Sequence, residues 1–262
     1  MYLAVLGCWA PYPAAGGACP GYLLVSKNLS LFLDCGNGSL AWLRRCTDFR
    51  ELTAVFISHF HPDHYVDLFC LRHALAGARR EGSRSLPLPL IAPLAPEKDA
   101  ETWRSYPDVL EFRGIAPEAC RSSLAVPLGE LLGNCFQGAS GGRVSFLLTD
   151  HPLPNLAVRF ENEGKTLVYT GDTGFFEALV EFAGGADLLV CEATLQEKDR
   201  GLGVSGHLTA REAGLLAASA GVKRLLLTHF WPEHDLRVTY REARAVFAGD
   251  LLLAREGLTV FF

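Results

Sequence analysis

Four possible metal ligands occur within six residues of this chain: His59, His61, Asp63 and His64. They follow Leu52–Ser58, an apolar run that predicts a buried strand. Residues two apart in an extended chain point the same way, so the first two histidines can reach one ion. The aspartate and the last histidine lie about one turn further on and can reach a second. Imidazole and carboxylate are ligands that Zn²⁺ accepts, so this segment predicts a metal site at a strand end.

Three further candidate ligands also follow apolar runs that predict strands. They are His151 after Val144–Leu148, Asp172 after Leu167–Gly171, and His229 after Leu225–Thr228. With the first cluster they make five histidines and two aspartates, which suits two ions that share one carboxylate. We therefore predict two divalent metal ions. Zn²⁺ is expected, with Mn²⁺ as the alternative, because both accept these ligands and availability decides between them.

The remainder of the chain alternates apolar runs with turn signals, which favours an α/β fold of two packed sheets with helices outside. Helices are predicted at Asp63–Arg79, Pro96–Tyr106, Thr209–Ala220 and Tyr240–Ala248, and one is predicted to end at Arg45. Strands are predicted at Tyr2–Gly7, Tyr22–Ser26, Leu31–Leu33, Leu52–Ser58, Leu88–Ala92, Val109–Phe112, Leu124–Val126, Val144–Leu148, Asn155–Glu161, Lys165–Thr170, Asp187–Cys191, Arg224–Thr228 and Leu258–Phe261. No linker interrupts the pattern, so one domain is expected over residues 1–262.

Charge and cysteine content bear on partners and on cellular location. The formal net charge of −5 excludes an overall basic footprint for nucleic acid, and the basic stretch Arg79–Arg84 is expected to be a solvated loop. Tyr2–Cys8 lacks the basic start and the length of a signal peptide, so a first strand is expected. No apolar run is long enough for a membrane. The eight cysteines show no C-x-x-C spacing, which favours reduced thiols in a cytoplasmic protein.

The complete ligand pattern resembles the metallo-β-lactamase superfamily. The resemblance is carried by His-x-His-x-Asp-His, a distant His, Gly-Asp-Thr and a final strand-end His, together with Leu33-Asp34-Cys35-Gly36 in an opening hairpin. It implies an αββα four-layer sandwich with the metals at one edge of the sheets. It also implies one ion on His59, His61 and His151, a second on Asp63, His64 and His229, and Asp172 as the bridge.

Two further segments resemble ribonuclease Z. They are Cys191-Glu192-Ala193-Thr194 and Gly206-His207-Leu208-Thr209-Ala210. This resemblance implies that Glu192 orients His207 near a scissile phosphate, although Leu208 stands where the family usually has Ser. Cleavage of a phosphodiester needs an activated water and a proton for the leaving oxygen. Asp63 is expected to hold that water or take its proton, and His207 to assist the leaving group.

Ribonuclease Z usually carries an arm that grips tRNA, inserted before the bridging aspartate. The residues between His151 and Asp172 are too few for such an arm, so a small diester or an RNA end is the expected substrate. Hydrolysis of a lactone or thioester is the alternative, and a di-iron redox protein and a metal-free binding module are less consistent with the ligands. Relatives are often dimers, so the resemblance makes a homodimer one possibility, and the sequence leaves the oligomeric state open. His73 and His234 are assigned no role.

Overall fold

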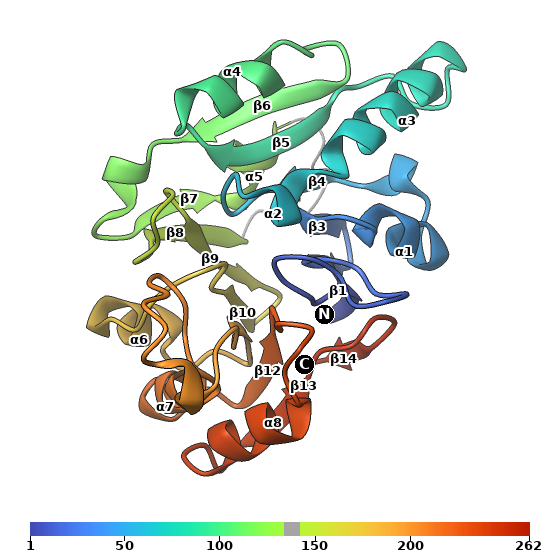
Figure 1. Ribbon diagram of the computed structural model, residues 1–262. Coiled ribbons are helices and arrows are strands. Elements are labelled where there is room, and N and C mark those ends of the chain that lie inside the picture. The colour runs from blue at the N-terminus through green and yellow to red at the C-terminus, as the bar shows by residue number, and fades with distance from the viewer. Residues whose placement is uncertain (134–141) are drawn as a thin grey trace.

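Two mixed sheets pack face to face in the computed structural model, which describes residues 1–133 and 142–262 (Figure 1). The first sheet has the order β14 (Thr259–Phe261), β1 (Tyr2–Gly7), β2 (Gly21–Ser26), β3 (Leu29–Cys35), β4 (Ala54–Phe56), β5 (Leu88–Pro93) and β6 (Leu110–Ile115). The second has the order β13 (Asp250–Leu253), β12 (Arg224–Thr228), β11 (Leu188–Glu192), β10 (Lys165–Tyr169), β9 (Leu156–Asn162), β8 (Arg143–Leu148) and β7 (Leu124–Pro127).

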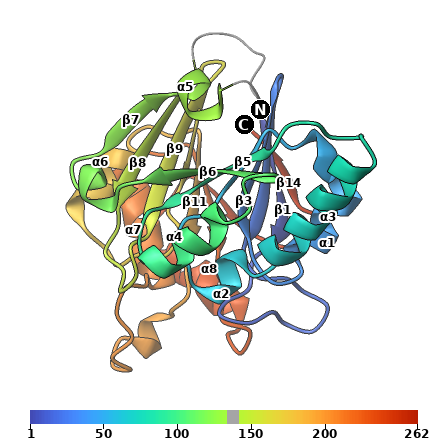
Figure 2. The same ribbon diagram turned by 90° about the horizontal axis from the view of Figure 1, so that it is seen from above.

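Helices cover the outer faces of both sheets (Figure 2). Beside the first sheet lie α1 (Ser39–Cys46), α2 (Pro62–Tyr65), α3 (Leu68–Arg80) and α4 (Glu97–Arg104). The second half of the chain contributes α5 (Leu128–Leu132), α6 (Glu177–Ala183), α7 (Ala210–Ser219) and α8 (Leu236–Arg244). Short 3₁₀ helices lie at Phe49–Glu51, Pro117–Cys120 and Glu197–Asp199. These layers confirm the predicted αββα sandwich.

Apolar side chains from both sheets meet in one buried core. Phe56 on β4 stacks against Phe146 on β8, with ring centroids 5.9 Å apart. Tyr22 on β2 meets Tyr169 on β10 at 5.2 Å. A second apolar cluster, which includes Trp103, lies between the first sheet and its helices. Each fully buried aromatic ring contributes roughly 1.5–3 kcal/mol by leaving water, so the two clusters fix how the layers stack.

The carboxyl ends of four strands meet at one edge of the second sheet. β10, β11 and β12 are parallel, and β8 runs with them because both β8 and β10 pair antiparallel with β9. The amide of Leu156 at the start of β9 donates to the carbonyl of Ser58, two residues after β4, at 3.0 Å. This bond joins the two sheets at the edge where the candidate ligands follow their strands.

Several element boundaries differ from the prediction. The helix predicted at Asp63–Arg79 is two helices, α2 and α3, because the chain turns at Asp67, whose amide donates to the carbonyl of Cys35 at 3.0 Å. The last helix begins at Leu236, four residues earlier than predicted, because the side chain of Asp235 caps it. Helices α5 and α6 and strand β13 were not predicted, since each is a short run without a complete amphipathic period.

The described cysteines are unpaired. Cys8, Cys19, Cys35, Cys120 and Cys191 are buried, whereas Cys46 and Cys70 are exposed. The eighth, Cys135, lies outside the described residues. Within residues 1–133 and 142–262, no helix combines the length and the apolar character that crossing a bilayer requires.

Candidate metal centre

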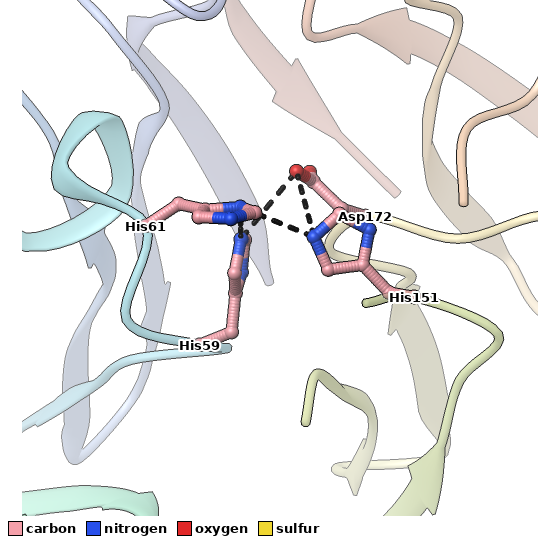
Figure 3. Close-up of side chains that lie close together, drawn as sticks. All are labelled: His59, His61, His151 and Asp172. Atoms are coloured by element: carbon pink, nitrogen blue, oxygen red, sulfur yellow. Dashed lines mark hydrogen bonds and ion pairs between the residues drawn. The ribbon is translucent and has the colours of Figure 1, made fainter. Parts of the chain in front are cut away.

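Four predicted ligands converge from three loops (Figure 3). His59 and His61 follow β4, His151 follows β8 and Asp172 follows β10. Nδ1 of His61 lies 2.9 Å from Nε2 of His59 and 3.1 Å from Nε2 of His151. Oδ2 of Asp172 lies 3.5 Å from Nε2 of His59. These four side chains therefore present three nitrogens and one oxygen to a common point.

A second group lies on the other side of Asp172. Nε2 of His64 is 3.0 Å from Nε2 of His229, and each is 3.6 Å from Oδ2 of Asp63. The second oxygen of Asp172, Oδ1, is 3.3 Å from His64 and 3.1 Å from His229. Asp172 thus directs one oxygen toward each group. The structure brings together all seven ligands predicted from the sequence.

These donors fit divalent cations. Oδ1 of Asp172 is buried, and no described residue makes a hydrogen bond to it, because the two nearby imidazole nitrogens lack hydrogen-bond geometry. A buried carboxylate oxygen without a partner is costly unless a cation compensates it. Burial, reinforced by the neighbouring His64, holds the pKa of His59 well below its usual value. The imidazole is therefore neutral, which is the form that binds a metal.

The segment that carries Asp63 packs tightly against the loop between β3 and α1. A Cβ atom on Gly36 would lie only 1.9 Å from the carbonyl oxygen of Asp63. Glycine is therefore required where the β3–α1 loop passes the ligand loop. The Leu33–Gly36 segment thus supports the site directly.

Hydrogen bonds behind the ligands fix their orientation. Asp34 is fully buried and accepts from Nδ1 of His64 at 2.7 Å and from the hydroxyl of Tyr169 at 2.5 Å. Nδ1 of His151 donates to the carbonyl of Gly206 at 2.9 Å. In both histidines this leaves Nε2 facing the cluster, as metal-binding histidines require. Asp34 contributed to the family resemblance but had no predicted role; its position at the end of β3 was the available signal.

Glu192 and His207 form a pair beside the second group. Nδ1 of His207 lies 3.0 Å from Oε1 and 3.2 Å from Oε2 of Glu192. Glu192 is fully buried and also accepts from the amides of Thr173 and Leu208, at 2.6 and 3.2 Å. The ring of His207 stacks on that of His229, with centroids 5.6 Å apart. The predicted proximity of this pair to the cluster is therefore observed.

The environment of His207 favours its protonated form. Burial lowers its pKa, but the charge of Glu192 and the hydrogen bond that His207 donates to it outweigh this and raise the pKa to about 9. The pair is positioned by the start of α7, where Thr209 and Glu212 form the capping box that the sequence predicts. Leu208 places its side chain in the core and contributes only its amide to Glu192.

Thr194 connects the Glu192–His207 pair to the ligands, a role that was not predicted from the sequence. Its hydroxyl lies 2.5 Å from Oε2 of Glu192 and 2.7 Å from Nδ1 of His229. The signal available in the sequence was its position two residues after Glu192, where a strand end again points toward the site.

A cavity of about 510 Å³ opens over the cluster. It is lined by Pro11, Tyr12, His61, Pro62, Asp63, Asp172, Thr194, Leu195, Val204, His207, His229 and Trp231. None of these lining residues is lysine or arginine. The cavity therefore combines an acidic, histidine-rich floor with apolar walls.

The remaining predicted segments lie outside this site. His73 is on α3, where it contacts Arg72. His234 pairs with Asp199, their Nε2 and Oδ2 atoms being 3.1 Å apart. In the basic stretch Arg79–Arg84, the guanidinium of Arg84 donates to the carbonyl of Leu52 at 3.1 Å. This arginine therefore binds the segment that precedes β4, whereas the sequence predicted only a solvated loop.

Comparisons with known proteins agree with the fold and the ligand pattern. A family model described as "Beta-lactamase superfamily domain" matches residues 31–230. The chain is 31% identical to a probable metallo-hydrolase, YhfI of Bacillus subtilis, over 98% of each chain. It is 32% identical to a ribonuclease Z of Ignicoccus hospitalis, over 93% of this chain and 92% of the relative.

Comparison with solved structures supports the same fold. The crystal structure of YhfI from Bacillus subtilis superposes with a TM-score of 0.87 at 30% identity, and the match covers 99% of this chain and 98% of that one. The short form of human tRNase Z superposes with a TM-score of 0.75 at 22% identity, over 100% and 99% of the two chains. The second likeness concerns the fold alone.

Proposed function

Because this chain belongs to the metallo-β-lactamase superfamily and carries its His/Asp metal-binding cluster, we propose that it is a zinc phosphodiesterase that binds two ions. The observation that supports the proposal is the pair of buried Glu192 and partly exposed His207, with Nδ1 of His207 held 3.0 Å from Oε1 of Glu192 beside the metal ligands. Cleavage of a carbonyl substrate needs the metal ligands but has no need for this pair.

The ligand geometry supports two ion sites that share one carboxylate. His59, His61 and His151 would hold one ion, Asp63, His64 and His229 the other, and Asp172 would bridge them. Such ions, when bound, polarise a phosphoryl oxygen and lower the pKa of water. The chain's own residues then position the water and supply protons.

Asp63 is the residue best placed to hold the attacking water. Its side chain lines the cavity, and its Oδ2 lies 3.6 Å from Nε2 of both His64 and His229. A carboxylate in this position accepts a hydrogen bond from the water and can take its proton as the water attacks phosphorus.

His207 is placed to assist the leaving group. Glu192 occupies Nδ1 of His207, so Nε2 is the atom left to donate a proton to the departing oxygen. The buried carboxylate of Glu192 keeps the imidazole in place and stabilises its protonated form. The P–O bond breaks as this oxygen gains the proton.

The substrate we propose is a small diester or an RNA end instead of a folded tRNA. β9 and β10 are joined by a turn of two residues, Glu163 and Gly164, both with positive φ. Such a tight hairpin leaves no segment between His151 and Asp172 that could form a tRNA-gripping arm. The cavity volume of about 510 Å³ suits a small ligand.

A comparison of three substrates with metal analysis of the same sample tests the proposal. The zinc-loaded protein is expected to hydrolyse bis-p-nitrophenyl phosphate faster than a lactone or a thioester. An Asp63→Ala variant serves as the inactive control. Rapid hydrolysis of the lactone or thioester with no turnover of the diester would replace the proposal by the carbonyl alternative.

A further inference from the structure

Two aromatic side chains line one wall of the cavity, and neither belongs to the catalytic cluster. Tyr12 lies in the loop after β1, and Trp231 lies two residues after the ligand His229. The two loops are joined by backbone hydrogen bonds: the amide of Ala10 donates to Phe230 O at 2.9 Å, and the amide of Phe230 donates to Cys8 O at 2.8 Å. The aromatic wall is thus fixed relative to the candidate metal ligands.

The polar edges of both rings are already used within the protein. The hydroxyl of Tyr12 donates to Oε2 of Glu233 at 2.6 Å and accepts from Nε1 of Trp231 at 3.3 Å. The indole also contacts the ring of His234, at a centroid distance of 5.3 Å, and His234 is held in turn by Asp199. The surface left for a ligand is therefore the apolar face of each ring. Because both rings are already held in position, a ligand can bind to them with little loss of side-chain entropy.

The rest of the cavity wall points to the same kind of ligand group. The lining also includes apolar side chains, among them Leu195 and Val204. The lining includes no lysine or arginine that could pair with additional phosphates. An uncharged planar ring suits such a wall, because every aromatic heterocycle has a face that stacks on tyrosine or tryptophan.

We propose that Tyr12 and Trp231 form a specificity subsite that binds the nucleobase of a small diester while its phosphate lies over the cluster. This inference rests on the proposed phosphodiesterase function. Stacking of one base on an aromatic side chain is worth roughly a tenfold to hundredfold gain in affinity. A diester with a base is therefore the preferred substrate over one that lacks it.

Two substrates test the subsite, one with a nucleobase on the ribose and one with a methoxy group in its place. They are the methyl ester of uridine 5′-phosphate and the methyl ester of methyl riboside 5-phosphate, and release of methanol is measured for both. The wild-type protein is expected to show a kcat/KM about tenfold or more higher for the uridine ester. Tyr12→Leu and Trp231→Leu should each remove most of this preference through KM and leave the riboside ester within about twofold.

The control variant is Phe261→Leu, which removes an exposed aromatic ring on β14 outside the cavity lining. It should leave both substrates unchanged. Equal kcat/KM values for the two esters in the wild-type protein, or equal losses in the variants, would overturn the subsite.

Binding separates failure of the subsite from failure of the proposed function. The metal-loaded Asp63→Ala protein, which should not turn over, gives the Kd of each ester by calorimetry. A tighter Kd for the uridine ester that is lost in Asp63→Ala/Trp231→Leu supports the subsite even if no ester is hydrolysed by the wild type. Equal Kd values overturn it whatever the activity.

Discussion

The hydroxyl of Thr194 lies 2.7 Å from Nδ1 of His229. The same hydroxyl lies 2.5 Å from the carboxylate of Glu192, which can only accept. A hydroxyl has one proton, so it donates to Glu192 and accepts from Nδ1–H of His229. This fixes the tautomer of His229 and leaves its Nε2 lone pair facing the cluster. Glu192 therefore supports both the candidate acid His207 and, through Thr194, a candidate metal ligand.

Thr194→Val removes this hydroxyl while it keeps the shape of the side chain. We expect affinity for the more weakly held zinc ion to fall about 10–100-fold, as is usual when a group that orients a metal-binding histidine is lost. Competition with a chelator measures the change. Thr194→Ser retains the hydroxyl and should stay close to the wild-type affinity. An unchanged affinity in Thr194→Val would mean that packing alone orients His229.

Asp63→Ala should abolish hydrolysis of bis-p-nitrophenyl phosphate. The carboxylate lies 3.6 Å from two histidine nitrogens of its group and lines the cavity, where it can hold the attacking water. Elemental analysis is expected to find about two zinc ions per wild-type chain. Circular dichroism should show that the variant stays folded. Wild-type turnover by the metal-loaded variant would remove Asp63 from the mechanism.

The ligands could be predicted from the sequence because each one follows a strand. His151, Asp172 and His229 are far apart in the chain, yet the parallel course of β8, β10 and β12 brings their strand ends to one edge. Residue types and strand ends are both visible in the sequence. The family resemblance added the grouping of ligands, and the interatomic distances agree with that grouping.

The supporting residues could not be predicted in the same way. Asp34 and Thr194 act by hydrogen bonds to partners 30 and 35 residues away in the chain, His64 and His229. Aspartate and threonine are common at strand ends and turns, so nothing local distinguishes these two. The split between α2 and α3 was also missed, because it depends on the contact of Asp67 with the end of β3.

Precursor tRNA should be a poor substrate compared with a small diester. The β9–β10 hairpin uses the chain between His151 and Asp172 and leaves no residues there for an arm, and the lining of the cavity contains no lysine or arginine. Cleavage of a radiolabelled precursor at physiological salt, compared with bis-p-nitrophenyl phosphate, measures the difference. Efficient cleavage at a single site would mean that another surface of the protein binds the tRNA.

Asp187→Asn should reduce stability in a way that depends on pH. Partial burial raises the pKa of Asp187, but the hydrogen bonds from Lys223 Nζ at 2.7 Å and Thr166 N at 2.8 Å hold it below its usual value. A carboxyl with a lowered pKa stabilises the fold above its unfolded pKa of about 4 and loses this contribution as pH falls through the folded pKa.

Urea unfolding at pH 7 should therefore show a loss of about 1 kcal/mol for Asp187→Asn. The difference from the wild type should shrink toward pH 3. Asp108→Asn, at an exposed position, is the matched control. A loss that stays constant with pH would show that the charge of Asp187 does not matter.

His207→Ala tests the general acid, and the choice of leaving group makes the test specific. An alkoxide is a poor leaving group and must gain a proton as it departs, whereas p-nitrophenolate needs little help. A general acid typically contributes about 10²–10⁴-fold. The variant should therefore slow a diester with a nucleoside or alkyl leaving group by roughly that factor and the nitrophenyl ester far less.

Glu192→Gln should show a weaker form of the same asymmetry. It removes the charge that holds Nδ1 of His207 at 3.0 Å but leaves the imidazole in place. Metal content should stay at the wild-type value in His207→Ala, since His207 is not among the proposed ligands. Equal losses on both leaving groups would count against proton donation. Loss of a metal from His207→Ala would instead make His207 a ligand, which its position within 4.8 Å of the ligand atoms of Asp172 and His229 permits.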